Sequence, residues 1–229
     1  MNDEQRIRLH TEVVSAPLCP ELKLHLVTER CPAFRMTEAQ AASAGLVEPY
    51  WAFCWPGGQA LSRHLLDHPE IVRGKRVLDF GAGCAVEALA ALRSGATAVV
   101  AADIDPLAGV AARLNAALND LPGPLLPSAD VESGRAEASF SVTDEDLIGT
   151  LPDCEVVLAG DVFYDRELAR RGLAWLTTLA RSGLEVLIGD PSRGFLDLSG
   201  LELVRAVRAH ADGDLGGAVM RETGVYRIR

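Results

Sequence analysis

Short apolar runs alternate with segments of helical period along the chain from Lys75 onward. Five runs have the length of buried strands: 76–80, 98–102, 138–142, 155–159 and 184–188. Three segments with apolar residues at helical spacing lie among them: 86–94, 107–118 and 167–181. Strands separated by helix-length segments predict an α/β fold, in which a mostly parallel sheet carries helices on both faces.

The end of the chain departs from this alternation. Residues 201–209 and 224–229 both have the pattern of a strand, and residues 212–222 between them include three glycines. Such a segment leaves little room for the helical crossover that parallel neighbours require. We therefore predict that the last two strands form an antiparallel hairpin.

The patterns are weaker before Lys75. Apolar and polar residues alternate over 22–26, which indicates a half-buried strand. Thr37 followed by Gln40 matches a capping box and predicts a short helix that ends near Ala44. Residues 49–58 hold two of the three tryptophans and end in turn-forming residues.

Size and charge narrow the class of protein. The chain of 229 residues suits one α/β domain, so we expect a single domain in which residues 1–70 cover the site and residues 71–229 form the core. The formal charge of −10 lacks the basic footprint of nucleic-acid binding, which favours a protein partner. No apolar run approaches the roughly 20 residues that cross a bilayer, so no membrane partner is expected. Residues 1–5 show no signal region, which indicates a cytoplasmic protein.

The cysteines and histidines show no metal-site spacing. Five cysteines are scattered without a C-x-x-C pair, and their odd number excludes a complete disulfide framework. His64 and His68 lie four residues apart on a predicted helix, yet no carboxylate or third histidine accompanies them in a recognisable pattern. We therefore predict reduced cysteines and no metal site.

The turn Gly81-Ala82-Gly83 follows the first of the five predicted strands and opens a helix. Glycines there let the backbone approach a ligand while helix N–H groups face it. Asp79 stands where methyltransferases commonly keep an acidic residue near the methionine moiety, and Asp103 ends the next strand, where a carboxylate can bind both ribose hydroxyls. The third glycine of the dinucleotide fingerprint is replaced by Val86. S-adenosylmethionine is the predicted cofactor, with a nicotinamide-dependent oxidoreductase as the alternative.

Two more assignments concern the segments after Asp103. Adenine is usually held after the following strand, which points to Thr143 or Asp144. Asp105 directly precedes Pro106, and we predict that it caps the next helix rather than contacting the cofactor.

Four segments together resemble one family: residues 49–63, 103–106, 160–165 and 189–193. From about Pro20 to Arg229 the chain is similar to the electron transfer flavoprotein β-subunit lysine methyltransferases and their bacterial relatives, within the seven-β-strand class. The resemblance implies a Rossmann-like sheet with strand order 3-2-1-4-5-7-6 and an antiparallel strand 7.

The resemblance also implies roles for individual residues. It adds cofactor contacts at Trp55, Ile104 and Gly160. It maps the family's Asp-x-x-Tyr/Phe lysine-methylation motif onto Asp161 and Tyr164. Relatives usually have glycine where this chain has Ala85, and the alanine is expected to tighten the methionine end of the pocket.

Aromatic residues near Asp161 suit a methyl-transfer site. Tyr164, Phe163, Trp51 and Trp55 are the predicted walls around the acceptor amine, which they would desolvate. Phe53 is instead assigned to the core beneath the N-terminal segment. For Asp161 the alternative is a cap on the helix that begins near Arg166.

These features predict an S-adenosylmethionine-dependent protein lysine N-methyltransferase. The resemblance points to the β subunit of electron transfer flavoprotein as the acceptor. A ribosomal protein or a small-molecule amine is the alternative acceptor. A binding module without activity is disfavoured, because Asp79, Asp103 and Asp161 are all present.

Overall fold

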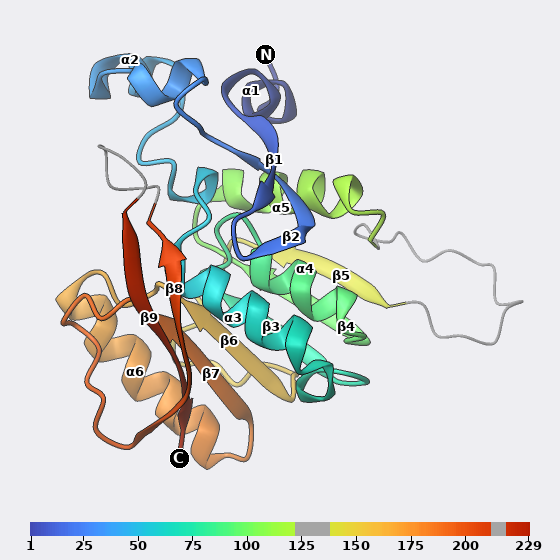
Figure 1. Cartoon of the computed structure of the whole chain (residues 1–229), viewed down its shortest axis with the longest axis vertical. Coiled ribbons are helices and arrows are strands. Elements are labelled where there is room, and N and C mark those ends of the chain that lie inside the picture. Colours follow the sequence, from blue (N-terminus) through green and yellow to red (C-terminus); the bar gives the residue numbers. More distant parts are fainter. Residues whose placement is uncertain (122–137, 212–218) are drawn as a thin grey trace, which may run out of the picture.

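A seven-stranded sheet forms the centre of the computed structural model, which describes residues 1–121, 138–211 and 219–229 (Figure 1). Its strands are β3 (Arg76–Phe80), β4 (Ala98–Ala102), β5 (Ser139–Thr143), β6 (Val156–Gly160), β7 (Glu185–Asp190), β8 (Leu201–His210) and β9 (Met220–Ile228). They lie in the order β5-β4-β3-β6-β7-β9-β8, and β9 is antiparallel to both of its neighbours. The remaining pairs are parallel, so the predicted order and hairpin are confirmed.

Helices cover both faces of this sheet (Figure 1). One face carries α3 (Pro56–Asp67), α4 (Val86–Arg93) and α5 (Pro106–Leu118), and the other carries α6 (Arg166–Arg181). Successive side chains of a strand point to opposite faces, so Val77 packs in the core with Leu89 whereas Leu78 packs with Leu176. Each such buried side chain contributes about 1.5–3 kcal/mol. No helix within the described ranges is long and apolar enough to span a bilayer.

The elements before α3 pack largely on α5. They are α1 (Asp3–His10), β1 (Glu12–Ala16), β2 (Cys19–Leu26), η1 (Pro32–Arg35), α2 (Glu38–Ser43) and η2 (Tyr50–Ala52). One further short helix, η3 (Pro69–Ile71), comes directly after α3. Asn115 Oδ1 accepts from the amide of His25 at 2.7 Å, and Asn119 Oδ1 accepts from the amide of Lys23 at 2.9 Å. These bonds fix the β1–β2 hairpin to α5, the helix that follows Asp103. The capping box of α2 is present as predicted, whereas α1 and β1 were not predicted.

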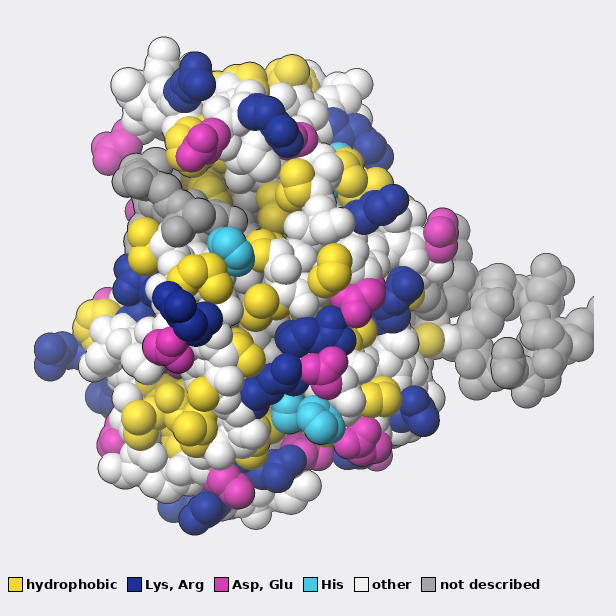
Figure 2. Space-filling view, viewed as in Figure 1, with side chains coloured by type: hydrophobic (Ala, Val, Ile, Leu, Met, Phe, Trp, Pro, Cys, Tyr) yellow, Lys and Arg dark blue, Asp and Glu magenta, His cyan; other side chains and the backbone are white. Residues whose placement is uncertain are grey.

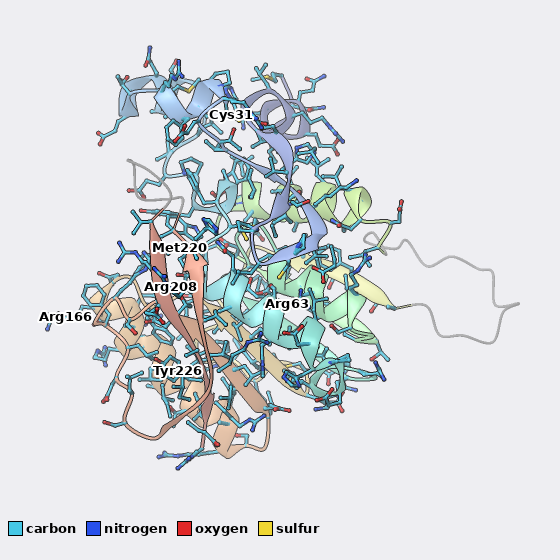
Figure 3. All side chains as sticks on the ribbon, in the orientation of Figure 1. Cys31, Arg63, Arg166, Arg208, Met220 and Tyr226 are labelled. Atoms are coloured by element: carbon cyan, nitrogen blue, oxygen red, sulfur yellow. The ribbon has the colours of Figure 1, made fainter. Side chains whose placement is uncertain are left out.

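The C-terminal hairpin is longer than the sequence indicated. β9 begins at Met220, four residues before the expected start, because the polar residues after Met220 concealed its strand pattern. Part of the predicted glycine-rich connection, residues 212–218, lies outside the described residues. Figure 3 places Arg208 and Met220 near the end of the hairpin that is farthest from the C-terminus.

Gln59 of α3 holds that end of the hairpin. Its Nε2 donates to the carbonyl of His210 at 2.8 Å, and its Oε1 accepts from the amide of His210 at 3.3 Å. Gln59 is fully buried, so these bonds are shielded from water and hold the hairpin more firmly than exposed bonds would. The first turn of α3 is thereby fixed between the hairpin and the ends of β6 and β7.

Candidate functional site

The turn after β3 presents bare backbone at the carboxyl edge of the sheet. Gly81 and Gly83 have φ of +73° and +50°, a region that favours glycine. A Cβ at Gly83 would find its nearest heavy atom, the Cα of Trp51, 3.8 Å away. That distance is an ordinary contact, and Gly81 is exposed while Gly83 is partly exposed, so the backbone of the turn is accessible to a cofactor.

Asp103 ties the end of β4 to this turn. Its Oδ2 accepts from the amide of Gly83 at 2.8 Å, and its Oδ1 accepts from the amide of Asp105 at 2.9 Å. Burial raises the pKa of Asp103, and both amides oppose that shift. Asp105 Oδ1 accepts from the amide of Leu107 at 2.9 Å, which confirms Asp105 as the cap of α5.

Asp79 lies beneath the turn and is completely buried. Its Oδ2 accepts from the amide of Ala88 at 3.0 Å, while its Oδ1 has no partner among the described residues. Burial raises the pKa of Asp79 to about 7, the Ala88 amide lowers it, and Asp103 raises it further. An unpartnered buried carboxylate oxygen is costly, so it suits a cationic or N–H donor group of a ligand. The ammonium of S-adenosylmethionine is such a group.

The other expected cofactor residues lie along the same edge. Ile104 is 72% exposed beside Asp103, which leaves an apolar surface for a flat ring. Thr143 ends β5, and its carbonyl accepts from the amide of Asp103 at 3.1 Å; Asp144 follows and is exposed. Gly160 ends β6 and packs against Glu87. A Cβ at Gly160 would lie 2.0 Å from Glu87 Oε1, so this contact leaves room only for glycine.

Ala85 has a left-handed backbone, with φ of 61° and ψ of 27°, at the position where the family resemblance predicts glycine. That conformation costs an alanine about 1–2 kcal/mol. We expect Ala85→Gly to raise the free energy of unfolding by about 0.5–1 kcal/mol, because the relieved strain exceeds the loss of one methyl group. Thermal unfolding measures it as a rise of about 1–4 °C.

Ala91→Gly is the matched control for that substitution. It removes a buried methyl group from the middle of α4 without relieving strain, so it should destabilise by about 1–2 kcal/mol. Equal losses in the two variants would contradict a strained backbone at Ala85.

Asp161 follows β6 directly, also with a left-handed backbone at φ of +57°. Its Oδ2 accepts from the amide of Gly58 at 3.0 Å in the first turn of α3, and its Oδ1 lies 3.2 Å from Arg193 Nη2. Its own amide donates to the carbonyl of Gly189 at 2.9 Å. Burial raises the pKa of Asp161 to about 7, against the lowering effects of Arg193 and the α3 amides.

The alternative assignment of Asp161 as the cap of α6 is wrong. Asp165 caps that helix, since its Oδ1 accepts from the amides of Glu167 and Leu168, each at 2.9 Å. Asp161 is therefore not needed to start α6.

Four aromatic rings, which we call the aromatic row, line up beside this carboxylate: Tyr164, Tyr50, Trp55 and Phe53. Successive ring centroids are 5.8, 6.2 and 5.5 Å apart. Tyr164 is 48% exposed, and partial burial raises the pKa of its hydroxyl. The row forms one wall from the end of β6 to the start of α3.

Burial differs from expectation for two aromatic residues. Trp51 and Phe163 are each 1% exposed, so their rings lie in the core and out of reach of an acceptor in this structure. Phe53 is partly buried: it packs against the core cluster that contains Trp51, as expected, and its ring also belongs to the row. Tyr50 was not singled out from the sequence, although it stands beside Trp51 in the same segment.

Glu87 and Arg193 were also missed. Glu87 is buried between Gly58 and Gly160, and burial raises its pKa well above the usual value. An acidic residue within the apolar segment 86–92 was the available signal. Arg193 lies in the loop after β7, inside a segment that carried the family resemblance but received no role.

An apolar cavity of about 540 Å³ adjoins the aromatic row. Phe34, Met36 and Leu46 line it together with Tyr50, Phe53 and Trp55. Glu38 and Glu48 are also among its lining residues. The cavity therefore lies between the segment around α2 and the aromatic row.

Charged side chains elsewhere are largely paired. Asp67 binds both Arg63 at 2.7 Å and Arg205 at 2.6 Å, and Figure 2 shows basic and acidic groups side by side over the middle of the face that it draws.

The rings of His64 and His68 lie 4.9 Å apart. Within residues 1–121, 138–211 and 219–229, no three His, Cys, Asp or Glu side chains are grouped to hold a metal ion.

Comparison with known proteins places these features in a family. A family model described as ribosomal protein L11 methyltransferase (PrmA) matches residues 60–140. The electron transfer flavoprotein beta subunit lysine methyltransferase of Xenopus laevis is 48% identical over 185 residues, which are 80% of this chain and 68% of that protein. Its Homo sapiens counterpart is 43% identical over 187 residues, 80% of this chain and 64% of that protein.

A solved structure supports the same fold. The putative RNA methyltransferase PH1948 from Pyrococcus horikoshii has a TM-score of 0.53 and 16% identity, and the match covers 74% of this chain and 81% of that one. The curated relatives are longer, and this chain spans about two thirds of their length. The chain belongs to the electron transfer flavoprotein β-subunit lysine methyltransferase family, among the S-adenosylmethionine-dependent methyltransferases.

Proposed function

We propose that this chain is a protein lysine N-methyltransferase whose acceptor is the β subunit of electron transfer flavoprotein. One observation carries the lysine assignment: the carboxylate of Asp161 and the ring of Trp55 surround a single cation. That cation is Arg193, which lies 3.2 Å from Asp161 Oδ1 and 5.2 Å from the centre of the Trp55 ring. A carboxylate and an aromatic face are the groups that bind an ammonium.

The chemistry requires a neutral amine at the moment of transfer. Free lysine has a pKa near 10.4, so removing its proton at pH 7 costs about 4.6 kcal/mol. Asp161 binds and aims the ammonium but by itself raises the pKa of the lysine. Tyr50 and Tyr164 of the aromatic row are about half exposed, so a bound acceptor would cover them, and the drier site would favour loss of the proton to solvent.

S-adenosylmethionine supplies the methyl group. The backbone at Gly81 and Gly83 would lie against it, Asp103 would accept from the ribose hydroxyls, and the unpartnered Oδ1 of Asp79 would accept from the ammonium. Ile104 would cover one face of the adenine, with Thr143 or Asp144 at its edge. Trp55 and Gly160 complete the proposed set.

Mass spectrometry of a purified acceptor tests the proposal. Electron transfer flavoprotein β subunit incubated with the enzyme and S-adenosylmethionine should gain whole methyl groups on lysine, and Asp161→Asn should strongly reduce the rate of that gain. Ribosomal protein L11 is the parallel acceptor, because the family model that matches residues 60–140 bears its name. Methylation of L11 alone would replace the proposed acceptor, and methylation of neither would reject both.

The proposal also includes a cytoplasmic location, a protein acceptor and a role for residues 1–70 in covering the site. The five cysteines are free, which suits a reducing compartment such as the cytoplasm. A chain with a formal charge of −10 favours a protein acceptor over nucleic acid. Residues 1–70 supply Tyr50 and Trp55, so this segment covers the site of a single domain over residues 1–229.

A further inference from the structure

Arg193 occupies the place that the proposed function assigns to the acceptor lysine. Its Nη2 lies 3.2 Å from Asp161 Oδ1, and its guanidinium carbon lies 5.2 Å from the centre of the Trp55 ring. The side chain of Arg193 is 28% exposed and that of Asp161 is 8% exposed, so the guanidinium lies on the solvent side of the carboxylate; we call the space between Asp161 and the Trp55 ring the ammonium pocket. Its Nε is buried and has no acceptor among the described residues, so the guanidinium is not bound with all of its donors.

The loop that carries Arg193 is held in a defined shape. Asp190 is buried at the end of β7, and its carboxylate accepts from the amides of Ser192, at 2.6 Å, and Arg193. Ser192 has a left-handed backbone with φ of +60°. The backbone of Arg193 is therefore fixed, while its long side chain reaches the pocket through rotatable bonds.

We propose that Arg193 is a positioning residue that fills the ammonium pocket of the free enzyme and is displaced by the acceptor lysine. This inference rests on the proposed function, because it takes Asp161 and Trp55 as the groups that bind the acceptor. Exchange of one cation for another keeps the buried carboxylate paired until the bound lysine loses its proton. A buried charge that loses its partner is costly, so the exchange avoids an unfavourable empty state.

Arg193 also controls the charge of Asp161. The groups that face Asp161 are Arg193 from the loop after β7, Asp190 from β7, Glu87 from α4, and the amides of Gly57 and Gly58 from α3. Asp190 raises the pKa of Asp161 and Arg193 lowers it, while Asp161 in turn raises the pKa of Glu87. Removal of the guanidinium should therefore raise the pKa of Asp161 and favour its protonated form at neutral pH.

Arg193→Gln and Arg193→Lys separate displacement from simple packing. The measurement is steady-state methylation of electron transfer flavoprotein β subunit between pH 6 and pH 9 at saturating S-adenosylmethionine. At the alkaline end of this range, once Asp161 is ionised in the variant, Arg193→Gln should lower the acceptor KM several-fold with little change in kcat, because no internal cation competes. Below pH 7 the same variant should lose about 10-fold or more in kcat/KM, because Asp161 is protonated.

Arg193→Lys restores a cation and should return the pH profile close to that of the wild type. Arg170→Gln, on the exposed side of α6, is the matched control and should change neither constant. S-adenosylhomocysteine affinity, measured by calorimetry, should stay within a few-fold in all variants. An unchanged acceptor KM and pH profile in Arg193→Gln overturns the inference, as does an equal loss in the Gln and Lys variants.

The pKa of Asp161, followed by carbon-detected NMR, distinguishes failure of the inference from failure of the proposed function. It should be higher in Arg193→Gln than in the wild type and nearly restored in Arg193→Lys. An active wild-type enzyme without that shift rejects the role of Arg193 alone. A wild-type protein that methylates no acceptor rejects the function, and with it the displacement by lysine.

Discussion

Asp161→Asn is expected to lower methylation kcat/KM by about 10²–10³-fold, the usual cost of removing one preorganised charged group from an active site. Asparagine tolerates the φ of +57° at this position and keeps an oxygen that can accept from the Gly58 amide. The substitution therefore removes the charge that pairs with a cation while it preserves the backbone. Alanine would abolish activity too, but it would add backbone strain and confuse the two causes.

Two measurements make that result specific to Asp161. Calorimetry should find the affinity for S-adenosylhomocysteine within a few-fold of the wild type, because Asp79 and Asp103 are unchanged. Asp165→Asn is the matched control: it makes the same substitution at an exposed helix cap, where asparagine also caps well, and activity should stay the same. Activity of Asp161→Asn near that of the wild type would remove Asp161 from the catalytic site.

Gly57→Ala should destabilise the protein by about 2–3 kcal/mol, the cost of overpacking a tight contact. A Cβ at Gly57 would lie 2.3 Å from the carbonyl oxygen of Gly189 and 2.6 Å from Asp161 Oδ2. The first neighbour is backbone and cannot move without shifting β7, and the second is the proposed ammonium ligand. Activity should therefore fall together with stability.

Gly172→Ala serves as the control for that substitution. Gly172 is buried in the middle of α6, but its Cβ would meet only the ring of Phe163 at 3.9 Å, an ordinary contact. Alanine is favoured there by about 0.5–1 kcal/mol. Urea unfolding of both variants gives the comparison, and a Gly57→Ala protein as stable as Gly172→Ala would show that α3 and β7 are not in close contact.

The sheet could be predicted because its parallel strands are buried on both faces. Such strands appear as short apolar runs, and the turn and helix signals between them set their order along the chain. β1 escaped prediction because Ala16 is its only buried residue, while Val13 and Ser15 are exposed. α1 escaped because it buries only Ile7 and His10, so its capping box had no apolar face to support it.

The positions of candidate site residues could be predicted where they lie at the ends of clearly marked strands. The turn at Gly81–Gly83 and the carboxylates that end β3, β4 and β6 follow from strand ends that the sequence marks clearly. Arg193 could not be assigned a role, because it meets Asp161 only through the pairing of β6 with β7. The burial of Trp51 could not be predicted either, because neither the helical nor the strand period applies to the short turn at Tyr50–Ala52.

The arrangement of the tryptophans gives the protein an optical reporter of its own. Of the three in the chain, Trp51 and Trp175 are buried, whereas Trp55 is partly exposed beneath the guanidinium of Arg193. Its indole Nε1 donates to the carbonyl of Tyr50 at 2.9 Å, which fixes the ring against the pocket. The solvent-sensitive part of the intrinsic fluorescence therefore comes from the pocket itself, and the arrival of an acceptor can be followed without a label.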